Sequence, residues 1–288
     1  MNFETCTICN SRKLVSIKTF SHAYLVKCTN CNFIFSHKKA TIEELTKHYT
    51  NYPRYDSLSP ITEKRYNELL DQFEPFRKTN NMIDLGCSNG LFLECAKKRG
   101  WNVHGTEFAE ECINACKKKG IVIYKSDQLP KDLLAQKFDV VTSFEVIEHI
   151  NTPNEEIELI KSLLRSGGVF YFTTPNFNSI SKYLLKEKWN IVEYPEHLSY
   201  FTPKTINYLL KKHGFKKSFI STTGISLSRF KQSIGKSEES RTTNNNTDEI
   251  LRDKLENNGF LFKIKQMINF KLNLFKIGDA MKGLYIKP

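Results

Sequence analysis

The stretch MIDLGCSNGL at residues 82–91 contains, in order, an apolar strand, an acidic residue, two glycines four positions apart and the start of a helix. Gly86 and Gly90 allow the backbone to approach a ligand closely, because they carry no side chain. In doubly wound α/β sheets, ligands bind in the crevice at the carboxyl ends of the strands. The segment from Asp84 to Gly90 is therefore predicted to be a ligand-binding loop after the first strand of such a sheet.

The pattern that follows this loop extends the prediction to a whole domain. Short apolar runs alternate with amphipathic segments that end in glycine, which indicates βαβ units and a parallel sheet. Gly100 and Gly120 are expected to end helices, and Thr152 and Thr202, each followed by proline, to begin them. We predict a Rossmann-like α/β sheet, to which AMKGLYIKP contributes a last strand. The other strands are expected near residues 82–85, 101–106, 121–125, 138–144, 168–173 and 215–222.

Two further acidic residues end predicted strands. Glu107 ends the second strand, 23 residues after Asp84, and is placed to accept hydrogen bonds from both hydroxyls of a ribose. Asp127 ends the third strand. These positions indicate that the ligand contains a nucleoside.

The segments IDLGCSNG, VHGTE, YKSDQLP, FDVVTSFEVIEH and LRSGGVFYFTTPN resemble the successive motifs of class I S-adenosylmethionine-dependent methyltransferases, over residues 81 to about 222. The resemblance implies that the two glycines lie close to the methionine part of the cofactor and that Asp84 holds its amino group. It also implies that Glu107 binds the ribose and Asp127 the adenine amino group. Where the family has a third glycine, this chain has Ser88, whose backbone amide remains available. The full implied cofactor-binding set is Asp84, Gly86, Cys87, Ser88, Gly90, Glu107, Phe108, Asp127, Gln128 and Glu145.

An NAD-dependent dehydrogenase, or a nucleotide-binding module on the same sheet, is the alternative. A dinucleotide fingerprint needs GxGxxG to bring a helix N-terminus onto a pyrophosphate, whereas the glycine spacing here is GxxxG. The sequence favours a methyltransferase.

The EVIEH turn after the fourth strand supplies candidate catalytic residues. Glu145, Glu148 and His149 stand at i, i+3 and i+4, so a helical turn would direct them to one side. Methyl transfer from a sulfonium is an in-line displacement that depends on alignment, with a base needed only if the acceptor must lose a proton. His149 is the predicted catalytic residue.

The ExxEH pattern is similar to that of ubiquinone-pathway O-methyltransferases and small-RNA 2′-O-methyltransferases, where it binds a divalent metal together with a further histidine. His197 in YPEHLSYF is a counterpart for that histidine. Carboxylates and imidazoles would suit Mg²⁺ or Mn²⁺, and the ion could lower the pKa of a substrate hydroxyl. The alternative is that the turn only shapes the active site. The metal-binding set would be Glu145, Glu148, His149 and His197.

Residues 1–37 contain two CxxC pairs, and each pair can supply two zinc ligands from one tight turn. Asn10 and Asn32 follow the pairs, and asparagine tolerates the left-handed conformation that such turns need. Four cysteines leave no open position for a substrate, so we predict a structural zinc ribbon. Its ligands are Cys6, Cys9, Cys28 and Cys31.

Composition limits the remaining possibilities. The chain has 288 residues, a net charge of +12 and no apolar run long enough to span a membrane. Its N-terminus lacks the pattern of a signal peptide, which predicts a cytoplasmic protein without disulfides. The basic charge suits a phosphate-bearing substrate, nucleic acid or an anionic membrane. The other cysteines are expected to be small buried side chains; they are Cys87, Cys95, Cys112 and Cys116.

The rest of the chain falls into segments of distinct character. Thr41 and Glu44 form a capping box for a helix to about Tyr49, and another helix is expected from Ile61 to Phe73. Residues 235–258 are polar, and Phe260 to Ile277 form an amphipathic helix. That helix could contact an anionic membrane, but packing against the sheet or a partner subunit is the simpler expectation. We divide the chain into a ribbon at 1–37, a helical linker or cap at 38–80, the core at 81–223, a polar segment with the amphipathic helix at 224–277, and the last strand at 278–288.

A zinc ribbon followed by a methyltransferase resembles enzymes of bacterial glycan and nucleotide-sugar biosynthesis. The resemblance implies O-methylation of a sugar-like or other small molecule. We expect a seven-stranded mixed sheet whose last strand is antiparallel, with the ribbon and residues 176–201 capping the substrate side. RNA and lipid-linked intermediates are alternative acceptors. A zinc-ribbon nucleic-acid-binding protein with an inactive enzyme domain is a further alternative, which the intact Asp84, Glu107 and Asp127 disfavour.

Overall fold

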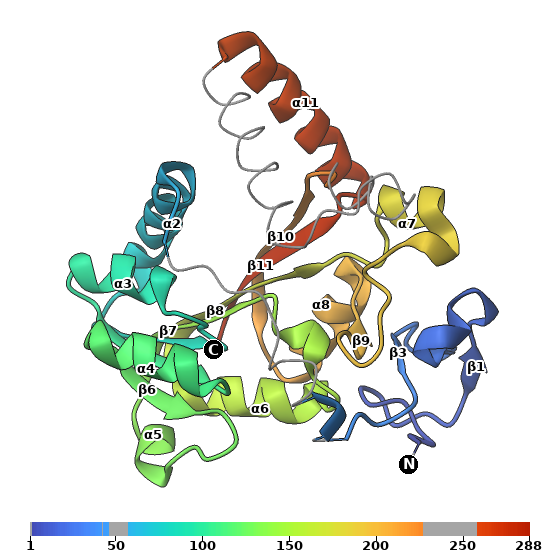
Figure 1. The fold of residues 1–288 in the computed structure, drawn as a ribbon, viewed down its shortest axis with the longest axis horizontal. Helices are drawn as coiled ribbons and strands as arrows, with labels where there is room; N and C mark the ends of the chain where they lie inside the picture. Colours follow the sequence, from blue (N-terminus) through green and yellow to red (C-terminus); the bar gives the residue numbers. More distant parts are fainter. Residues whose placement is uncertain (1, 42, 46–56, 227–257) are drawn as a thin grey trace.

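The computed structural model of the chain describes residues 2–41, 43–45, 57–226 and 258–288. Its centre is a seven-stranded sheet in the order β10-β11-β8-β7-β4-β5-β6, which is parallel except that β11 runs antiparallel to both of its neighbours (Figure 1). The predicted Rossmann-like sheet with an antiparallel last strand is confirmed. The strands are β4 (Asn81–Leu85), β5 (Asn102–Glu107), β6 (Val122–Lys125), β7 (Phe138–Phe144), β8 (Leu164–Pro175), β10 (Lys216–Thr223) and β11 (Ala280–Ile286).

Helices cover both faces of this sheet, because successive strand residues point to opposite faces. Met82 and Val140 pack with α2 and α3 on one face, whereas Ile83 and Val141 pack with α5, α6 and α8 on the other. The two resulting cores are separate apolar clusters. The helices are α2 (Pro60–Phe73), α3 (Leu91–Lys98), α4 (Glu110–Lys118), α5 (Lys131–Ala135), α6 (Pro153–Leu163) and α8 (Pro203–Lys212), with the 3₁₀ turn η2 (Glu74–Phe76) after α2.

The expected helix boundaries are largely found. Thr202 and Thr205 form a capping box at the start of α8, and Gly100 and Gly120 adopt the left-handed conformation after α3 and α4. The Thr41–Glu44 capping box is present, with reciprocal bonds of 2.9 and 3.1 Å. The remainder of the helix expected there, most of the linker before α2 and the polar segment at 235–257 lie outside the described residues.

The N-terminal region forms a second sheet, in the order β1-β2-β3-β9. Its fourth strand comes from far along the chain, and pairs Ile34 with Tyr200 and Phe35 with Ser199. The ribbon that we delimited at residue 37 therefore has its sheet completed by the segment before α8. The elements are β1 (Leu14–Ser16), η1 (Lys18–Ala23), β2 (Leu25–Cys28), β3 (Ile34–Ser36) and β9 (Ser199–Tyr200).

The ribbon packs directly on the core of the main sheet. Ile8 and Phe33 belong to the same buried cluster as the residues of α6 and α8, and the Phe33 ring lies 5.1 Å from that of Phe201. The Asn154 amide donates to the backbone carbonyls of Thr7 and Ile8, at 2.6 and 3.0 Å. The ribbon is thus anchored to α6 by polar contacts as well as by apolar burial.

The segment from residue 176 to 201 lies between the ribbon and the main sheet. It contains α7 (Ile180–Leu185) and η4 (Lys186–Lys188) before β9. Phe177 and Trp189 of this segment pack with Phe20 and Leu25 of the ribbon in a third apolar cluster. The expectation that both regions lie on one side of the core therefore has a structural basis in this shared cluster.

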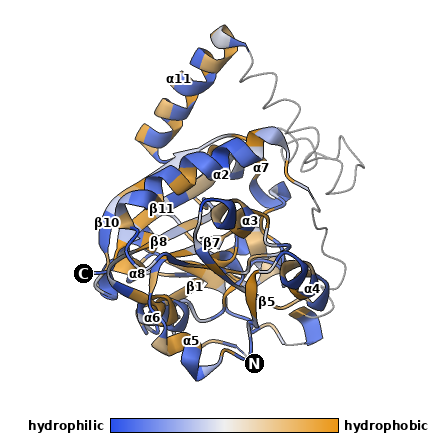
Figure 2. Cartoon of the chain, turned by 90° about the vertical axis from the view of Figure 1, so that its left-hand side faces the viewer, coloured by the Kyte–Doolittle hydropathy of each residue, from blue (hydrophilic) through white to orange (hydrophobic). Residues whose placement is uncertain are grey.

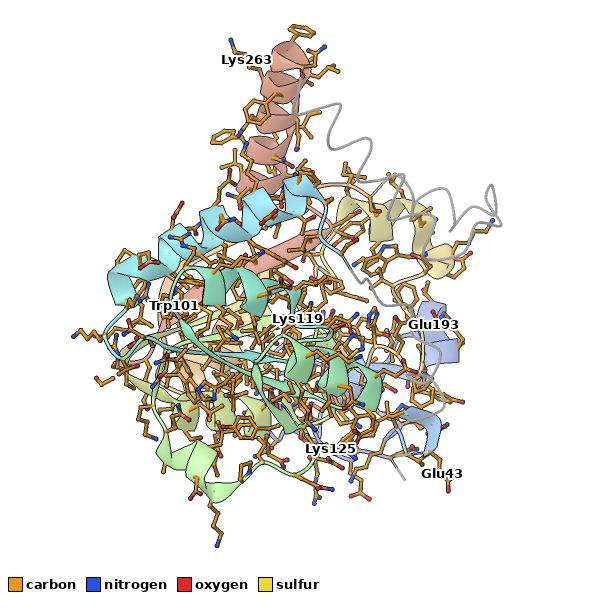
Figure 3. All side chains as sticks on the ribbon, turned by 60° about the vertical axis from the view of Figure 1, so that its left-hand side comes forward. Glu43, Trp101, Lys119, Lys125, Glu193 and Lys263 are labelled. Atoms are coloured by element: carbon orange, nitrogen blue, oxygen red, sulfur yellow. The ribbon has the colours of Figure 1, made fainter. Side chains whose placement is uncertain are left out.

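The C-terminal helix α11 (Gly259–Phe275) differs from the expectation that its apolar face packs against the sheet. It projects from the body of the protein, with hydrophobic residues along its length and Lys263 near its outer end (Figures 2 and 3). Leu272 is its only fully buried residue. The contacts with β10 are instead made by Asn269 and Asn273, which accept hydrogen bonds from Gly224 N and Thr222 N. No helix among the described residues is long and apolar enough to cross a membrane.

Asp139, at the start of β7, connects three parts of the main sheet. Its side chain is fully buried and accepts hydrogen bonds from three consecutive backbone N–H groups, at residues 78–80, over 2.7–2.9 Å. The Arg165 guanidinium donates to its other oxygen at 2.5 Å. Burial alone would raise the pKa of the Asp139 carboxyl, but the backbone donors and Arg165 outweigh it and hold this pKa below its ordinary value.

We expect Asp139→Ala to lower the free energy of unfolding by about 3 kcal/mol or more, because it leaves a buried cation and three backbone donors without their acceptor. A carboxyl with a lowered folded-state pKa stabilises the fold above its unfolded pKa of about 3.9, and loses this contribution as the pH falls through the lower folded value. Urea titrations should therefore show a wild-type advantage that is constant near neutral pH and shrinks below about pH 4. Asp71→Ala, which removes an exposed partner of Arg99, should cost less than about 1 kcal/mol.

Candidate functional site

The loop after β4 has the conformation that its glycines were predicted to provide. Gly86 and Gly90 have φ angles of 70° and 68°, and Ser88 between them also lies in the left-handed region at 49°. A Cβ atom on Gly86 would lie 2.6 Å from the Val146 side chain. The loop therefore turns tightly at the carboxyl end of β4. Strand β5 lies on one side of β4 and β7 on the other, which is the position where doubly wound sheets bind their ligands.

Asp84 lies at the base of this loop and is almost fully buried, with 3% of its surface exposed. Its carboxylate accepts a 2.7 Å hydrogen bond from the Thr142 hydroxyl on β7. Burial and, to a lesser extent, the Glu107 carboxylate raise the pKa of Asp84 to about 7, against the lowering effect of the Thr142 hydrogen bond. A cationic group bound beside Asp84 would favour its ionised form.

Glu107 joins the end of β5 to the same loop. Its carboxylate accepts hydrogen bonds from Ser88 N at 2.9 Å, and from Phe108 N and Ala109 N at 2.9 and 3.0 Å. Three backbone donors thus fix the carboxylate beside the loop, at the position predicted for ribose binding.

The remaining predicted adenine-side residues lie at the next strand end. Asp127 and Gln128 are exposed in the turn after β6, and Ser126 N in this turn donates to the Glu107 carbonyl at 3.1 Å. Phe108 is a large apolar side chain with 40% of its surface exposed. These residues follow the strand ends in the order that the sequence implied.

Three cysteines, Cys87, Cys112 and Cys116, lie at or beside the loop. Cys87 Sγ lies 3.8 Å from Cys116 Sγ, and the Cys116 thiol contacts the Ser88 carbonyl at 3.3 Å. The prediction that the cysteines outside the ribbon are small buried side chains is confirmed, since each is at most 7% exposed; they are Cys87, Cys95, Cys112 and Cys116.

A second polar group lies beyond the end of β7. Glu148, His149 and His197 each offer one ligand atom, and these atoms lie within 4.8 Å of one another. Glu148 and His149 belong to η3 (Ile147–His149), whereas His197 precedes β9. The structure therefore brings together three of the four residues proposed for a divalent metal.

Hydrogen bonds fix the orientation of each member of this group. The Nδ1 atoms of His149 and His197 lie 2.5 Å from the backbone carbonyls of Glu196 and Ile191. The Thr174 hydroxyl donates to the Glu148 carboxylate at 2.9 Å. Imidazoles held by a carbonyl at one nitrogen, and a carboxylate held by a hydroxyl, are the usual outer contacts of metal ligands.

Glu145 lies outside this three-residue group. Its φ of 53° turns the backbone before η3, so Glu145 does not share one helical turn with Glu148 and His149. It is exposed and lies near Tyr171, whose pKa is raised first by burial and then by the Glu145 carboxylate. Glu145 remains at the carboxyl edge of the sheet, between the loop after β4 and η3.

The ribbon reaches the three-residue group through hydrogen bonds of the backbone. Ser36 N donates to the Leu198 carbonyl at 2.9 Å, and Leu198 N donates to the Glu148 carbonyl at 2.8 Å. A small cavity adjoins Glu148 and His197, and aromatic rings from the 176–201 segment contribute to its wall; its lining residues are Glu148, Pro175, Phe177, Trp189, Ile191, His197, Ser199 and Tyr200.

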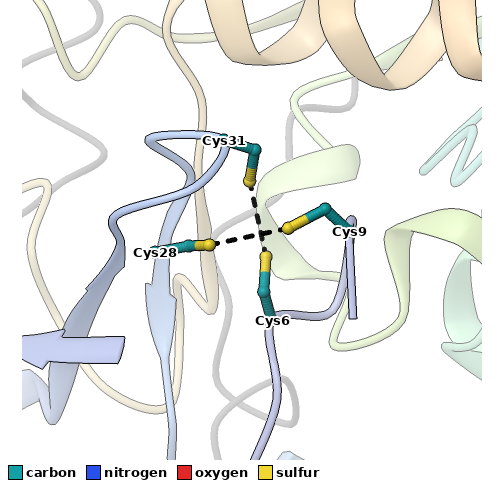
Figure 4. A group of neighbouring side chains, drawn as sticks. All are labelled: Cys6, Cys9, Cys28 and Cys31. Atoms are coloured by element: carbon teal, nitrogen blue, oxygen red, sulfur yellow. Dashed lines mark hydrogen bonds between the residues drawn. The ribbon is translucent and has the colours of Figure 1, made fainter. Parts of the chain in front are cut away.

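The four ribbon cysteines converge on one point (Figure 4). Cys6 Sγ lies 3.5 Å from Cys31 Sγ, and Cys9 Sγ lies 3.5 Å from Cys28 Sγ. The residues after the two CxxC pairs, Asn10 and Asn32, have φ angles of 58° and 63°, as predicted. In each turn the asparagine N–H donates to the carbonyl of the first cysteine at 2.9 Å. This sulfur spacing suits four thiolates around one tetrahedral ion with bonds of about 2.3 Å.

Several polar residues that hold the site were missed from the sequence. Thr142 holds Asp84, Thr174 holds Glu148, and the Thr106 hydroxyl accepts from Gly86 N at 3.2 Å. Each is a buried threonine near the carboxyl end of a strand. Such a position is itself a signal, since a buried hydroxyl is costly without a hydrogen-bond partner.

The fold is that of α/β proteins that bind nucleosides at the carboxyl edge of the sheet. Three features define this class here: the strand order, the loop after β4 and the acidic residues at the strand ends. A family model described as a methyltransferase domain matches residues 60–218, which is more than half of the chain. The chain belongs to this methyltransferase family.

Curated relatives and a solved structure agree with this assignment. A ubiquinone biosynthesis O-methyltransferase of Colwellia psychrerythraea is 34% identical over 111 residues, which cover 36% of this chain and 45% of the relative. One from Actinobacillus pleuropneumoniae is 31% identical over 115 residues, covering 36% and 49%. The chain thus spans about half the length of these relatives. A SAM-dependent methyltransferase from Archaeoglobus fulgidus shares the fold, with a TM-score of 0.50 and 18% identity over 86% of this chain and 100% of that one.

We expect Gly90→Ala to lower the free energy of unfolding by about 2 kcal/mol or more, because the new methyl group adds a clash to an unfavourable φ. Its Cβ would lie 2.6 Å from Ile121 Cδ1 and 2.9 Å from Cys116 Sγ. Gly224→Ala is the matched control, since its φ is 74° and nothing lies within 4 Å of the added atom. Denaturant unfolding of both variants separates the cost of the positive φ, which both share, from the cost of the clash, which only Gly90→Ala has. Equal losses in the free energy of unfolding would contradict the steric argument.

Proposed function

We propose that this chain is a S-adenosylmethionine-dependent methyltransferase that methylates a hydroxyl group of a small, sugar-like molecule. The observation that carries the proposal is the convergence of Asp84, Glu107 and the Gly86–Gly90 turn at one strand end, in a chain of the methyltransferase family. The O-methyltransferase names of the curated relatives support oxygen as the acceptor atom.

The residues present suit the cofactor. A buried carboxylate such as Asp84 would hold its cationic amino group, and Glu107 would accept hydrogen bonds from the ribose hydroxyls. The glycines would permit close approach of the backbone, and Asp127 and Phe108 would lie on the adenine side. Bound there, the cofactor would supply a methyl group on a sulfonium, so the protein has mainly to align the acceptor and exclude water.

The group of Glu148, His149 and His197 would act on the acceptor. It follows β7, next to the loop after β4, and adjoins the small cavity. As a metal site, one carboxylate and two imidazoles would favour a transition-metal ion such as Mn²⁺ over Mg²⁺, which prefers oxygen ligands. The ion would lower the pKa of a coordinated hydroxyl. Without metal, His149 would serve as the base that removes the hydroxyl proton.

The four-cysteine cluster would hold a structural Zn²⁺. Its sulfur spacing and the left-handed asparagines support this proposal. Because β3 pairs with β9, the zinc would also stabilise the segment that carries His197. The curated relatives, whose names refer to ubiquinone biosynthesis, support a small acceptor molecule over RNA. A cytoplasmic location remains part of the proposal.

Isothermal titration calorimetry tests the cofactor. We expect S-adenosylmethionine to bind the wild type, and Glu107→Ala to weaken binding by about 10- to 100-fold through the loss of charged hydrogen bonds. Glu155→Ala, an exposed carboxylate on α6, is the matched control and should bind normally. Binding of NAD in place of S-adenosylmethionine would overturn the proposal.

Titration with Mn²⁺, followed by calorimetry or electron paramagnetic resonance, tests the metal site without an activity assay. We expect His197→Ala to abolish binding and Thr174→Val to weaken it about 10- to 100-fold, because Thr174 orients the Glu148 carboxylate. His22→Ala, which removes an exposed imidazole, should have no effect. Unchanged binding in His197→Ala would contradict the metal site. His149 would then be expected to act as the base, with His149→Ala lowering turnover by about 10²- to 10⁴-fold.

Elemental analysis tests the zinc site. We expect one Zn²⁺ for each wild-type chain, and loss of the ion with a lower melting temperature in Cys28→Ser, because so small a sheet has little core of its own. Cys95→Ser removes a buried thiol in α3 and should keep its zinc. A full zinc content in Cys28→Ser would show that the ion lies elsewhere.

A further inference from the structure

Helix α11 exposes large apolar side chains that a soluble protein normally buries. Phe260, Phe270, Leu274 and Phe275 each have between 63% and 73% of their surface exposed. Met267 and Ile268 have about half of their surface exposed, at 53% and 45%. An apolar surface of this kind marks an interaction site.

The orientation of α11 is fixed by its polar side. Asn269 and Asn273 bind the backbone at Gly224 and Thr222, and the ammonium group of Lys276 donates to the Ile220 carbonyl at 2.9 Å. The amide side of the helix is thus held on β10 together with the buried Leu272, which leaves most of the other apolar side chains exposed. The helix is attached to the protein by its C-terminal half, and its N-terminal half projects (Figure 1).

The charge of α11 has one sign. Lys263, Lys265 and Lys271 lie among the apolar side chains, and the helix contains no acidic residue. Contact between the α11 helices of two copies would bring only positive charges together, which disfavours a second copy as the partner. A surface of negative charge with an apolar interior is the complementary partner.

The exposed surface continues onto α7. Ile180 N donates to the Ile277 carbonyl at 2.9 Å, so α7 lies beside the C-terminal end of α11. Tyr183 and Leu184 on α7 are 58% and 64% exposed. An aromatic side chain with a polar tip, next to leucine, suits the boundary between lipid head groups and acyl chains.

We propose that α11 and α7 form a surface that binds the protein to an anionic lipid bilayer. Phenylalanine and leucine side chains enter the outer part of the acyl region, and Lys263 and Lys271 bind lipid phosphates, as in other interfacial amphipathic helices. With 17 residues, α11 is about 25 Å long and lies in the interface without crossing the bilayer. Anionic lipid, and not an acidic protein, is favoured because exposed apolar side chains and lysines occur together along the projecting half, as the boundary between head groups and acyl chains requires.

Vesicle flotation with the full chain tests the proposal. We expect binding to vesicles of phosphatidylcholine with phosphatidylglycerol, much weaker binding to phosphatidylcholine alone, and a loss of binding at high salt. The double variant Lys263→Gln/Lys271→Gln should lower the partition coefficient by about 10- to 30-fold. The double variant Phe260→Ser/Phe270→Ser should also lose binding, which shows that charge alone is insufficient.

A charge-matched control is available on α4. The variant Lys117→Gln/Lys118→Gln removes two exposed lysines there and should float like the wild type. A melting curve for each variant confirms that it is folded. The proposal is overturned if the wild type binds no vesicles, or if the α11 variants float as well as the wild type. A dimer in light scattering that is lost in Phe260→Ser/Phe270→Ser, without vesicle binding, would identify a second copy as the partner.

Discussion

The position of β4 between β5 and β7 is the constraint on which the site depends. Parallel pairing places the carboxyl ends of these strands at one edge, so the loop after β4 lies between residues far apart in sequence. Asp84 thereby reaches Thr142 on one neighbour, and Ser88 reaches Glu107 on the other. Asp139 stabilises the opposite end of β7 through the backbone before β4. Register in the sheet therefore determines the geometry of the ligand loop.

A second constraint links the cysteine cluster to the acceptor side of the proposed active site. The connection runs from β3 through β9 to Leu198, the residue after His197. The Leu198 N–H donates to the backbone carbonyl of Glu148. Every step in this connection is a backbone hydrogen bond, so it depends little on the side chains in between. The ribbon is thus both a cover for the core and a support for the segment that carries a candidate ligand. A metal site in one region can in this way stabilise the geometry of another.

The sheet, its antiparallel last strand, the glycine turn and the asparagine turns of the ribbon could all be predicted, because each follows from local spacing or from a required backbone conformation. Three features could not. Pairing of β3 with β9 joins two very short strands across most of the chain, and no local pattern encodes it. The left-handed Glu145 broke the helical turn assumed for EVIEH. The orientation of α11 depends on whether its asparagines or its apolar side chains contact β10. The periodicity of the helix alone does not decide between these two arrangements.

The contribution of β9 to the ribbon has a consequence for how the chain is made. The cysteine-rich segment is synthesised before β9, so β3 keeps an unpaired edge until residues 199–200 have been added. An open strand edge of this kind can pair with other chains and aggregate. The four cysteines can therefore come together early, whereas the small sheet is completed only after residues 199–200 have been made. Cutting the protein after residue 37 would yield a fragment with the same exposed edge, so the ribbon cannot be treated as a detachable module.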